Sequence, residues 1–315
     1  MSEFKPEHAS VLLDEVLGFL ELDSDSVVID ATLGLGGHTQ AVLERFDSTR
    51  VIGIDQDERA LAAASERLRR FGDRFVGFHS NFSAVAKVAN SSGLESVDAI
   101  IADLGVSSMQ LDDPERGFSF RFDAPLDMRM DATAGKTAAE LLEELEEEEI
   151  ANLIYRYGEE RKSRRIARLI IGRREKGQPV QTTAELAQLV ERAVGRSPKN
   201  KIHPATRTFQ ALRIAVNDEL GILDRFITDS VDLLKPNGKL CVITFHSLED
   251  RIVKQTFQKL SGRCFCPPRI PSCVCGAVKR VEILTRKPVV PTEAEMNANP
   301  RSRSAKLRVC RKLAN

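Results

Sequence analysis

A glycine-rich turn followed by an acidic residue is the first feature of the chain that could bind a small molecule. Gly34, Gly36 and Gly37 lie in the segment Asp30–His38, and Asp55 follows them. Glycines in such a turn let a ligand approach the backbone closely, and a carboxylate about 20 residues later can accept hydrogen bonds from ribose hydroxyls. A glycine-rich turn alone can be a plain strand–helix connection. Together with Asp55, it favours a nucleotide-type cofactor site.

The residues around this turn discriminate between cofactors. A dinucleotide site prefers Gly-x-Gly-x-x-Gly, whereas here Gly37 follows Gly36 directly. The carboxylate of Asp30 suits a cationic ligand better than a pyrophosphate, and Phe82 could flank an adenine. Asp103 ends a further apolar run, at the position where open parallel sheets bind ligands. These features favour S-adenosylmethionine over a nicotinamide cofactor.

Alternating apolar runs and helical patterns must position these residues. Strands are expected at residues 26–30, 51–55, 75–79, 97–103 and 239–245, and helices at 39–46, 58–71, 84–90, 206–234 and from 248 onward. Buried strands separated by helices predict βαβ units, and hence an open, doubly wound parallel sheet of the α/β class. Residues 280–284 and 305–311 are expected to form a closing hairpin.

The alternation stops after Asp103. Residues 105–130 are predicted to be long loops, and residues 137–194 have a helical period without strands. We therefore expect one sheet domain, formed by residues 1–111 and 201–315, that is interrupted by an inserted all-helical subdomain at 112–200.

Composition excludes few functions but does exclude a membrane protein. The chain has 315 residues, with 42% hydrophobic and 29% charged residues and a net charge of zero from 46 basic and 46 acidic side chains. No apolar run approaches the roughly 18 residues of a membrane span, and no signal peptide is recognisable. A cytoplasmic location is the expectation.

Several long motifs resemble one bacterial family, the ribosomal RNA small-subunit methyltransferase H family, also called MraW. The motifs are Asp103–Ser108, Gln110–Asp113, Glu115–Phe120, Pro125–Asp131, Tyr157–Arg161, His203–Arg213, Phe245–Arg251 and Asn299–Ser304. With matches from His8 to Arg308, the resemblance covers essentially the whole chain.

The resemblance implies a class I (Rossmann-like) methyltransferase fold and N4-methylation of one cytidine in the decoding region of 16S rRNA. The implied methyl donor is S-adenosylmethionine, and the implied partner is 16S rRNA or the small ribosomal subunit. The inserted subdomain would then recognise the substrate. The family's cofactor contacts fall on Gly36, Gly37, His38, Asp55, Phe82, Asp103 and Gln110.

Methylation of cytosine N4 needs help because its lone pair is delocalised into the ring. Hydrogen-bond acceptors for the N4 protons would help, and Asp103, Ser107 and Ser108 are the candidates. The chain lacks the Pro-Pro-aromatic motif that amino-methyltransferases often carry here. Phe118 or Phe120 could stack on the base, or pack in a core.

His246 is a further candidate because it follows the strand at 239–245. It could face the substrate. The alternative is structural, in which Ser247 caps the next helix and Asp250 completes a capping box.

Basic residues that could contact RNA phosphate are spread over three segments. They are Arg161, Arg165, Arg168, Arg213, Arg301 and Arg303. Arg213 would share a polar helix face with Thr206, Gln210 and Asn217. Solvated helix surfaces are the alternative for all of these residues.

Four cysteines are crowded into a short segment. Cys264, Cys266, Cys273 and Cys275 could hold a structural zinc ion, although their Cys-x-Cys spacing is tighter than the usual knuckle. We expect no metal in the methyl-transfer chemistry itself.

Two other classes of function remain to be separated by experiment. One is a methyltransferase that acts on DNA or protein, and the other is a non-catalytic RNA-binding factor of ribosome assembly.

Overall fold

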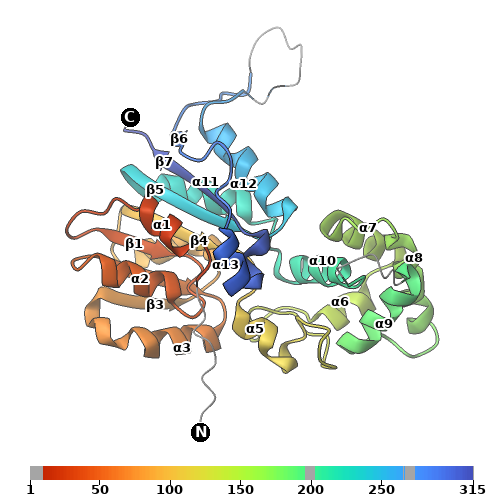
Figure 1. Cartoon of the computed structure of the whole chain (residues 1–315). Helices are drawn as coiled ribbons and strands as arrows, with labels where there is room; N and C mark the ends of the chain where they lie inside the picture. Colours follow the sequence, from red (N-terminus) through yellow and green to blue (C-terminus); the bar gives the residue numbers. More distant parts are fainter. Residues whose placement is uncertain (1–9, 196–202, 265, 267–273, 315) are drawn as a thin grey trace. The chain divides into compact units, whose positions relative to one another are not determined.

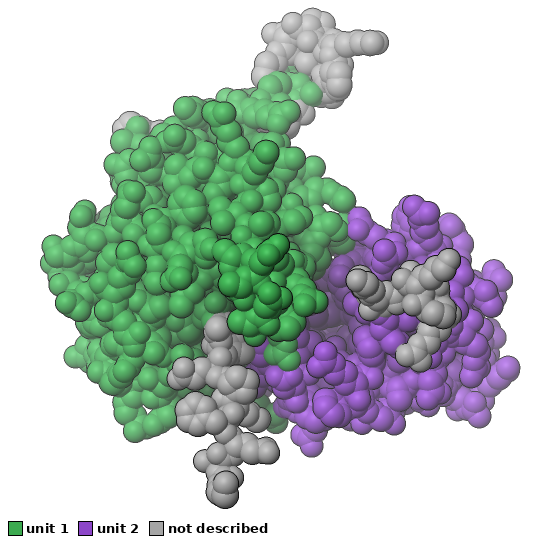
Figure 2. Space-filling view, viewed as in Figure 1, with its two compact units in different colours: residues 1–105, 220–315 green, residues 106–219 purple. Residues whose placement is uncertain are grey.

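The computed structural model describes residues 10–195, 203–264, 266 and 274–314. The chain forms two compact units, which Figure 2 shows in different colours. Unit 1 comprises Met1–Gly105 and Leu220–Asn315, and unit 2 comprises Val106–Glu219. Each unit has its own hydrophobic core and is described by itself below.

Unit 1 is built on a seven-stranded sheet with the order β3-β2-β1-β4-β5-β7-β6 (Figure 1). The strands are β1 (Val27–Asp30), β2 (Arg50–Asp55), β3 (Phe75–His79), β4 (Val97–Asp103), β5 (Leu234–Thr244), β6 (Val281–Ile283) and β7 (Lys306–Lys312). The first five are parallel, whereas β7 is antiparallel to both β5 and β6. The order reverses between β1 and β4, and this reversal is where doubly wound sheets bind ligands.

Helices cover both faces of this sheet. They are α1 (Leu13–Phe19), α2 (Gly37–Arg45), α3 (Glu58–Leu68), α4 (Val85–Ser91), α11 (Leu223–Leu233), α12 (Ser247–Leu260) and α13 (Glu293–Ala298), with short 3-10 turns η1 (Arg69–Arg74), η2 (Phe82–Ala84) and η4 (Pro300–Ser304). Alternate residues of β1 enter different cores, since Val27 and Ile29 pack with α4, α11 and α12, whereas Val28 packs with α1, α2 and α3. Burial on both faces explains the unbroken apolar runs.

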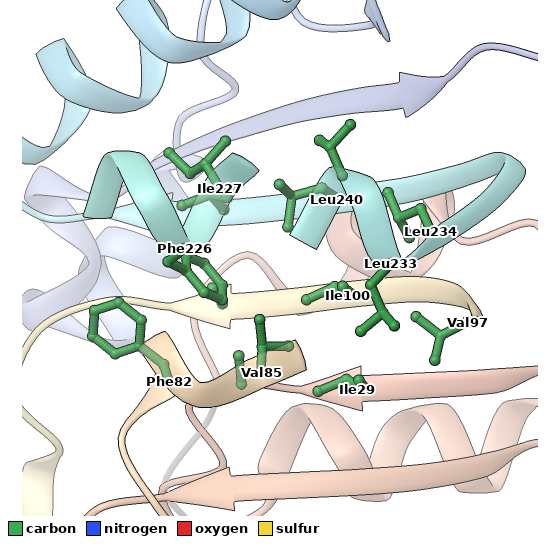
Figure 3. Packing of buried hydrophobic residues seen from close by; sticks show 14 of the residues in the cluster. Ile29, Phe82, Val85, Val97, Ile100, Phe226, Ile227, Leu233, Leu234 and Leu240 are labelled. Carbon is green, nitrogen blue, oxygen red and sulfur yellow. The ribbon is translucent and has the colours of Figure 1, made fainter. Parts of the chain in front are cut away.

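Figure 3 shows the first of these cores. Phe226 of α11 lies beside Phe82 of η2, and Leu233 lies close to Ile100 of β4. The Phe82 and Phe226 rings meet edge to face, with their centroids 5.0 Å apart. The ring that was expected to flank an adenine is therefore anchored by an aromatic partner on its protein side.

Unit 2 is helical. Its elements are α5 (Ser108–Asp112), η3 (Pro114–Arg116), α6 (Ala138–Glu144), α7 (Glu147–Gly158), α8 (Ser163–Arg174), α9 (Thr183–Val194) and α10 (Thr206–Asn217). Their apolar faces form a separate core that includes Ile150, Ile166, Leu186 and Phe209. The unit extends beyond the insert expected at 112–200, because Phe209 and Leu212 of α10 pack into this core.

The predicted doubly wound, class I (Rossmann-like) methyltransferase fold is confirmed, and so is the antiparallel pairing of the last two strands. Two details were wrong. The single helix expected at 206–234 is two helices, because Asp218 takes a left-handed conformation with φ 48° after α10. The loops expected at 105–130 contain the short helix α5. In the described part of the chain, no helix has the length and apolar content of a bilayer span.

Candidate active site

Three carboxylates end neighbouring strands of unit 1. Asp55 is the last residue of β2, Asp30 of β1 and Asp103 of β4, and these strands are adjacent in the sheet. Because parallel strands end at the same edge, the three side chains gather at the reversal of strand order. Each is placed at that edge by the strand before it.

Asp30 lies buried in the interior of unit 1. It is 1% exposed. Its Oδ2 accepts a 2.7 Å hydrogen bond from the Thr39 hydroxyl, and its Oδ1 accepts one from the Thr32 amide. Thr39 lies in the first turn of α2, so Asp30 fixes the start of this helix under the glycine-rich turn. Its role is thus to hold the turn, rather than the direct cofactor contact considered above.

Asp55 fastens the glycine-rich turn from the other side. Its Oδ2 accepts a 2.7 Å hydrogen bond from the Gly34 amide, and its Oδ1 accepts one of 2.8 Å from the Asp57 amide. A carboxylate has about four lone-pair positions, so two bonds leave acceptor capacity for ribose hydroxyls. The geometry is compatible with the predicted ribose contact.

The three glycines of the turn serve different purposes. A side chain at Gly37 would collide with the Ser10 hydroxyl, and one at Gly36, which has φ +75°, would press on Leu68. Gly34 has φ +52°, and a Cβ there would meet no atom within 4 Å. The open backbone at the turn is therefore at Gly34, whereas Gly36 and Gly37 are required by packing inside the protein.

His38 connects the glycine-rich turn to the carboxylate of β4. The ring is 6% exposed. Its Nε2 lies 3.0 Å from the Val11 carbonyl, so Nε2 carries the hydrogen. Its Nδ1 lies 4.0 Å from Oδ2 of Asp103. His38 thus links the turn to Asp103, since both of its buried ring nitrogens are directed at protein atoms.

Asp103 has an acceptor oxygen that the described residues do not satisfy. Its backbone amide donates a 2.6 Å hydrogen bond to the Thr32 hydroxyl, which holds the end of β4 beside β1. Its Oδ2 faces His38, while Oδ1 is buried without a hydrogen-bond partner in the described part of the chain. Buried carboxylate oxygens are rarely left unpaired. Oδ1 therefore marks where a donor group of a ligand would bind.

Burial raises the pKa of all three carboxyls to about 6. Desolvation is the largest cause in each case, and the charge on Asp30 raises the pKa of both Asp55 and Asp103 further. Hydrogen bonds from Thr39 and Thr32 oppose the shift at Asp30. A cluster of three carboxyls with raised pKa values favours binding a cationic ligand.

His246 caps a helix. Its Nδ1 accepts from the Glu249 amide at 3.4 Å, and Glu249 Oε2 accepts from the His246 amide, so the two residues form the capping box of α12. His246 Nε2 lies 3.1 Å from Glu249 Oε1. The alternative with Ser247 as cap and Asp250 as its partner was therefore wrong. The ring is held by Glu249, and Asp250 instead pairs with Arg308.

The remaining candidates near β4 belong to unit 2. Ser107 is the N-cap of α5, since its hydroxyl accepts from the Gln110 amide at 3.2 Å and Gln110 Oε1 accepts from the Ser107 amide at 3.0 Å. Ser108 is 9% and Gln110 5% exposed. The oxygens of Ser107 and Gln110 thus shape the chain after β4.

Comparison with known proteins assigns the chain. The model of the MraW methylase family matches residues 5–313. The chain belongs to the MraW methylase family. It is 50% identical over 307 residues to the ribosomal RNA small subunit methyltransferase H of Carboxydothermus hydrogenoformans, covering 98% of each chain. It is 52% identical to the enzyme of the same name from Symbiobacterium thermophilum, covering 97% of this chain and 96% of that one.

Among solved structures, an rRNA methylase from Streptococcus thermophilus matches over 100% of both chains, with a TM-score of 0.42 and 12% identity. A likeness of this size adds nothing to the family assignment.

In this member of the MraW family, the polar face of α10 turns into unit 2. Arg213 forms a two-pronged ion pair with Glu219, with both distances 2.8 Å and exposures of only 15% and 8%. Gln210 donates to the Tyr157 carbonyl, and Asn217 bonds to both Met128 and Met130. The structure contradicts a phosphate contact by Arg213, because its guanidinium is committed to Glu219.

Two aromatic side chains of unit 2 are also committed to packing. Phe120 stacks on His203 with centroids 4.4 Å apart and meets Phe209 edge to face at 5.1 Å. Phe118 is 7% exposed and lies under the Arg116 guanidinium. Their alternative as packing anchors is therefore the one that the structure supports.

The other predicted RNA contacts of this family member are exposed. Arg161 precedes α8, Arg165 and Arg168 lie on it, and all three are exposed, as are Arg301 and Arg303 of η4. Arg168 has a carboxylate of Glu147 at 3.7 Å.

A basic pocket of unit 1 was missed by sequence reasoning. It has a volume of about 440 Å³ between α12 and β6, and its lining includes Lys254, Lys279, Arg286 and Arg308. The four residues are scattered along the chain, so no local pattern identifies them. Gly34 was named as part of the glycine-rich turn, but the sequence did not show that it, rather than Gly36 or Gly37, is the open position.

Proposed function

We propose that this chain transfers a methyl group from S-adenosylmethionine to N4 of one cytidine in the decoding region of 16S rRNA. Membership of a methylase family over residues 5–313 supports methyl transfer. The names of the Carboxydothermus and Symbiobacterium relatives support small-subunit rRNA as the acceptor. The observation in the structure that carries the proposal is the unsatisfied Oδ1 of Asp103. An RNA substrate of this kind places the reaction in the cytoplasm.

The donor site consists of the glycine-rich turn after β1, the last residue of β2 and the first residue of η2. The Asp55 carboxylate accepts from the ribose hydroxyls, and it keeps the Gly34 backbone in position through the 2.7 Å bond. Phe82, braced by Phe226, borders the adenine. Gly36, Gly37 and His38 hold the turn, and the family resemblance adds Gln110 of α5 as a predicted cofactor contact. When bound, S-adenosylmethionine supplies an electrophilic methyl group on a sulfonium leaving group.

Asp103 acts on the acceptor amine. Oδ1 accepts a hydrogen bond from an N4 hydrogen, which orients the amine and supports the positive charge that develops on nitrogen. As the N4–methyl bond forms, the methyl–sulfur bond breaks, and Asp103 takes the N4 proton. A pKa of about 6 makes this carboxylate a stronger base than an ordinary aspartate while leaving it largely ionised at neutral pH.

Ser107, Ser108 and His246 are assigned positioning roles around this step. Ser107 fixes the start of α5, and His246 fixes the start of α12 through Glu249. We assign Ser108 to the same turn as Ser107, since it is the first residue of α5.

Exposed arginines and the basic pocket would hold the RNA backbone. Arg161, Arg165 and Arg168 offer contacts from unit 2, and Arg301 and Arg303 from unit 1. Substrate recognition by unit 2 remains part of this proposal. Phosphate contacts of this kind make binding weaken as salt is raised.

The experiment uses labelled S-adenosylmethionine and 30S subunits that lack their own N4-methylcytidine. We expect label in one decoding-region nucleoside, identified by mass spectrometry. Asp103→Asn should lower kcat by about 10²-fold or more, because Asn cannot take the proton. Asp73→Asn, which changes an exposed carboxylate of η1, is the matched control and should keep full activity.

Three outcomes would contradict the proposal. Label in DNA or protein but not in subunits would show that the methyl acceptor is not 16S rRNA. Binding of subunits without any transfer would indicate an assembly factor. Full activity of Asp103→Asn would remove the assigned base while leaving the acceptor intact.

A further inference from the structure

Three cysteines of unit 1 lie together although they come from the two arms of one loop. Cys264 and Cys266 follow α12, whereas Cys275 precedes β6. Their sulfur atoms all lie within 4.8 Å of one another. Cys273, the remaining cysteine of this segment, lies outside the described residues.

The sulfur separation matches a shared metal ion better than a disulfide. Cys264 Sγ and Cys275 Sγ are 3.7 Å apart. Two thiolates on one tetrahedral zinc, each bonded at about 2.3 Å, are separated by about 3.8 Å, whereas a disulfide requires about 2.0 Å. The Val274 amide also donates to Cys266 Sγ at 3.4 Å, and such a bond stabilises a thiolate.

The other described cysteines have the opposite surroundings. Cys241 lies in the middle of β5 and Cys310 in β7, and both are completely buried among apolar residues. Burial raises the pKa of the Cys241 thiol to about 12 and that of Cys310 still higher, so both stay protonated. The clustered cysteines are more accessible and lie where a metal can reach them.

The loop is also closed at its base without help from the sulfur atoms. Ser261 and Lys279 form an isolated antiparallel bridge. Gly262, with φ +81°, lies against the backbone of Lys279, where a side chain would press on it. The two arms are therefore aligned before they reach the cysteines, which reduces the entropy lost when one ion joins them.

We propose that Cys264, Cys266 and Cys275 bind one zinc ion as a structural site. Each thiol loses its proton on binding, and the three thiolates leave one tetrahedral position for a further donor. The site has no part in methyl transfer, because α12 starts after the carboxyl end of β5 and runs back about 21 Å over its 14 residues. The ion instead holds the arm that carries Lys279, which lines the basic pocket.

The test measures metal in untagged protein that is purified without chelator and then supplied with zinc. We expect about one zinc per chain by mass spectrometry of the metal. Cys264→Ser and Cys275→Ser should each lower the content below about a tenth of an equivalent at equal free zinc. Cys241→Ala, which removes a buried thiol outside the cluster, is the matched control and should keep the full content.

Cobalt provides a measurement that does not depend on the folding of any variant. Replacing zinc by cobalt in the wild-type chain should give the intense thiolate-to-cobalt charge-transfer absorption and the visible d–d bands of a tetrahedral thiolate site. Cofactor titration of the Cys264→Ser variant then reports whether unit 1 is still folded.

Two results would overturn the proposal. One is zinc below about a tenth of an equivalent in the reconstituted wild-type chain, with no thiolate band from cobalt. The other is a Cys264–Cys275 disulfide, found by peptide mass mapping of freshly purified protein whose free thiols are alkylated before digestion without added reductant.

Discussion

At the scale of single residues, the Asp103 carboxylate is poorly solvated, although its proposed role in methyl transfer requires the ionised form. Its Oδ1 is buried without a partner among the described residues, and desolvation raises its pKa to about 6. Such a residue lowers the stability of the cofactor-free protein at neutral pH.

We therefore expect Asp103→Asn to stabilise the cofactor-free chain at pH 7, by on the order of 1–3 kcal/mol in the free energy of unfolding, because a neutral amide replaces a buried charge. Urea unfolding of the two proteins measures this difference. Equal or lower stability of the variant at pH 7 would show that the carboxylate is better solvated than its burial implies.

The pH dependence of that difference has a definite sign. A raised pKa means that the folded state holds the Asp103 proton more tightly than the unfolded state does. The resulting stabilisation is complete below the ordinary pKa of 3.8 and is lost as pH rises through about 6. The advantage of Asp103→Asn should thus grow from pH 4 to pH 7, and an advantage that shrinks over this range would contradict the assignment.

At the scale of elements, α7 and α10 touch through a glycine. A Cβ at Gly158 would lie 2.4 Å from the Arg207 carbonyl oxygen, which belongs to the backbone of α10 and cannot move alone. Gly158→Ala should lower the unfolding free energy by about 1–3 kcal/mol. Gly172→Ala in α8, where a Cβ meets nothing within 4 Å, should instead raise it by up to about 1 kcal/mol. Thermal unfolding followed by circular dichroism compares the stability of the two variants. Similar effects of Gly158→Ala and Gly172→Ala would refute the close approach of α7 to α10.

Arg213 separates a structural role from an RNA contact. Glu219 is 7% exposed, so losing its two-pronged partner leaves a charge in a poorly solvated place. Arg213→Ala should cost about 3–5 kcal/mol of stability, whereas the salt dependence of RNA binding should stay unchanged. Arg165→Ala, at an exposed position, should leave the stability unchanged and weaken the salt dependence of RNA binding. Unchanged stability of Arg213→Ala, together with a weaker salt dependence of its RNA binding, would instead indicate a phosphate contact.

The elements were predictable where local pattern decides them. The strands before Asp30, Asp55 and Asp103 are unbroken apolar runs, and their ends located the carboxylates correctly. The His246–Glu249 cap was missed because histidine is an uncommon N-cap, although the spacing to Glu249 is that of a capping box. The Arg213–Glu219 pair depends on a chain reversal, which a periodic pattern does not contain, whereas the crowding of the cysteines was visible in the sequence itself. The sequence located Gly34 in the turn but could not distinguish it from Gly36 and Gly37, because its open space exists only once the turn is folded.

At the scale of the whole molecule, the described residues of the two units pack into cores that do not share residues. Two lie on the two faces of the sheet of unit 1, and the third lies among the helices of unit 2; Figure 2 shows the two units in different colours. Ligands stabilise only the part of a protein to which they bind.

We therefore expect thermal unfolding to show two transitions, one for each unit. S-adenosylmethionine at about 100 times its Kd should raise the unfolding free energy of unit 1 by on the order of 3 kcal/mol. Hydrogen exchange assigns the transitions, with peptides of β4 and of α7 as reporters. A single transition for both peptides, with and without the cofactor, would show that the units unfold together.

The pairing of β4 with β5 has a consequence for synthesis on the ribosome. Residues 104–233 separate these neighbouring strands, and all of unit 2 lies in that interval. A nascent chain exposes β3, β2, β1 and β4 long before β5 and β7 emerge, so one apolar edge of the growing sheet waits unpaired. Unit 2, whose core residues all come from its own segment, can finish folding during that wait. The half-built sheet is thus the stage at which this protein is most exposed to aggregation, and the stage at which a chaperone would help it most.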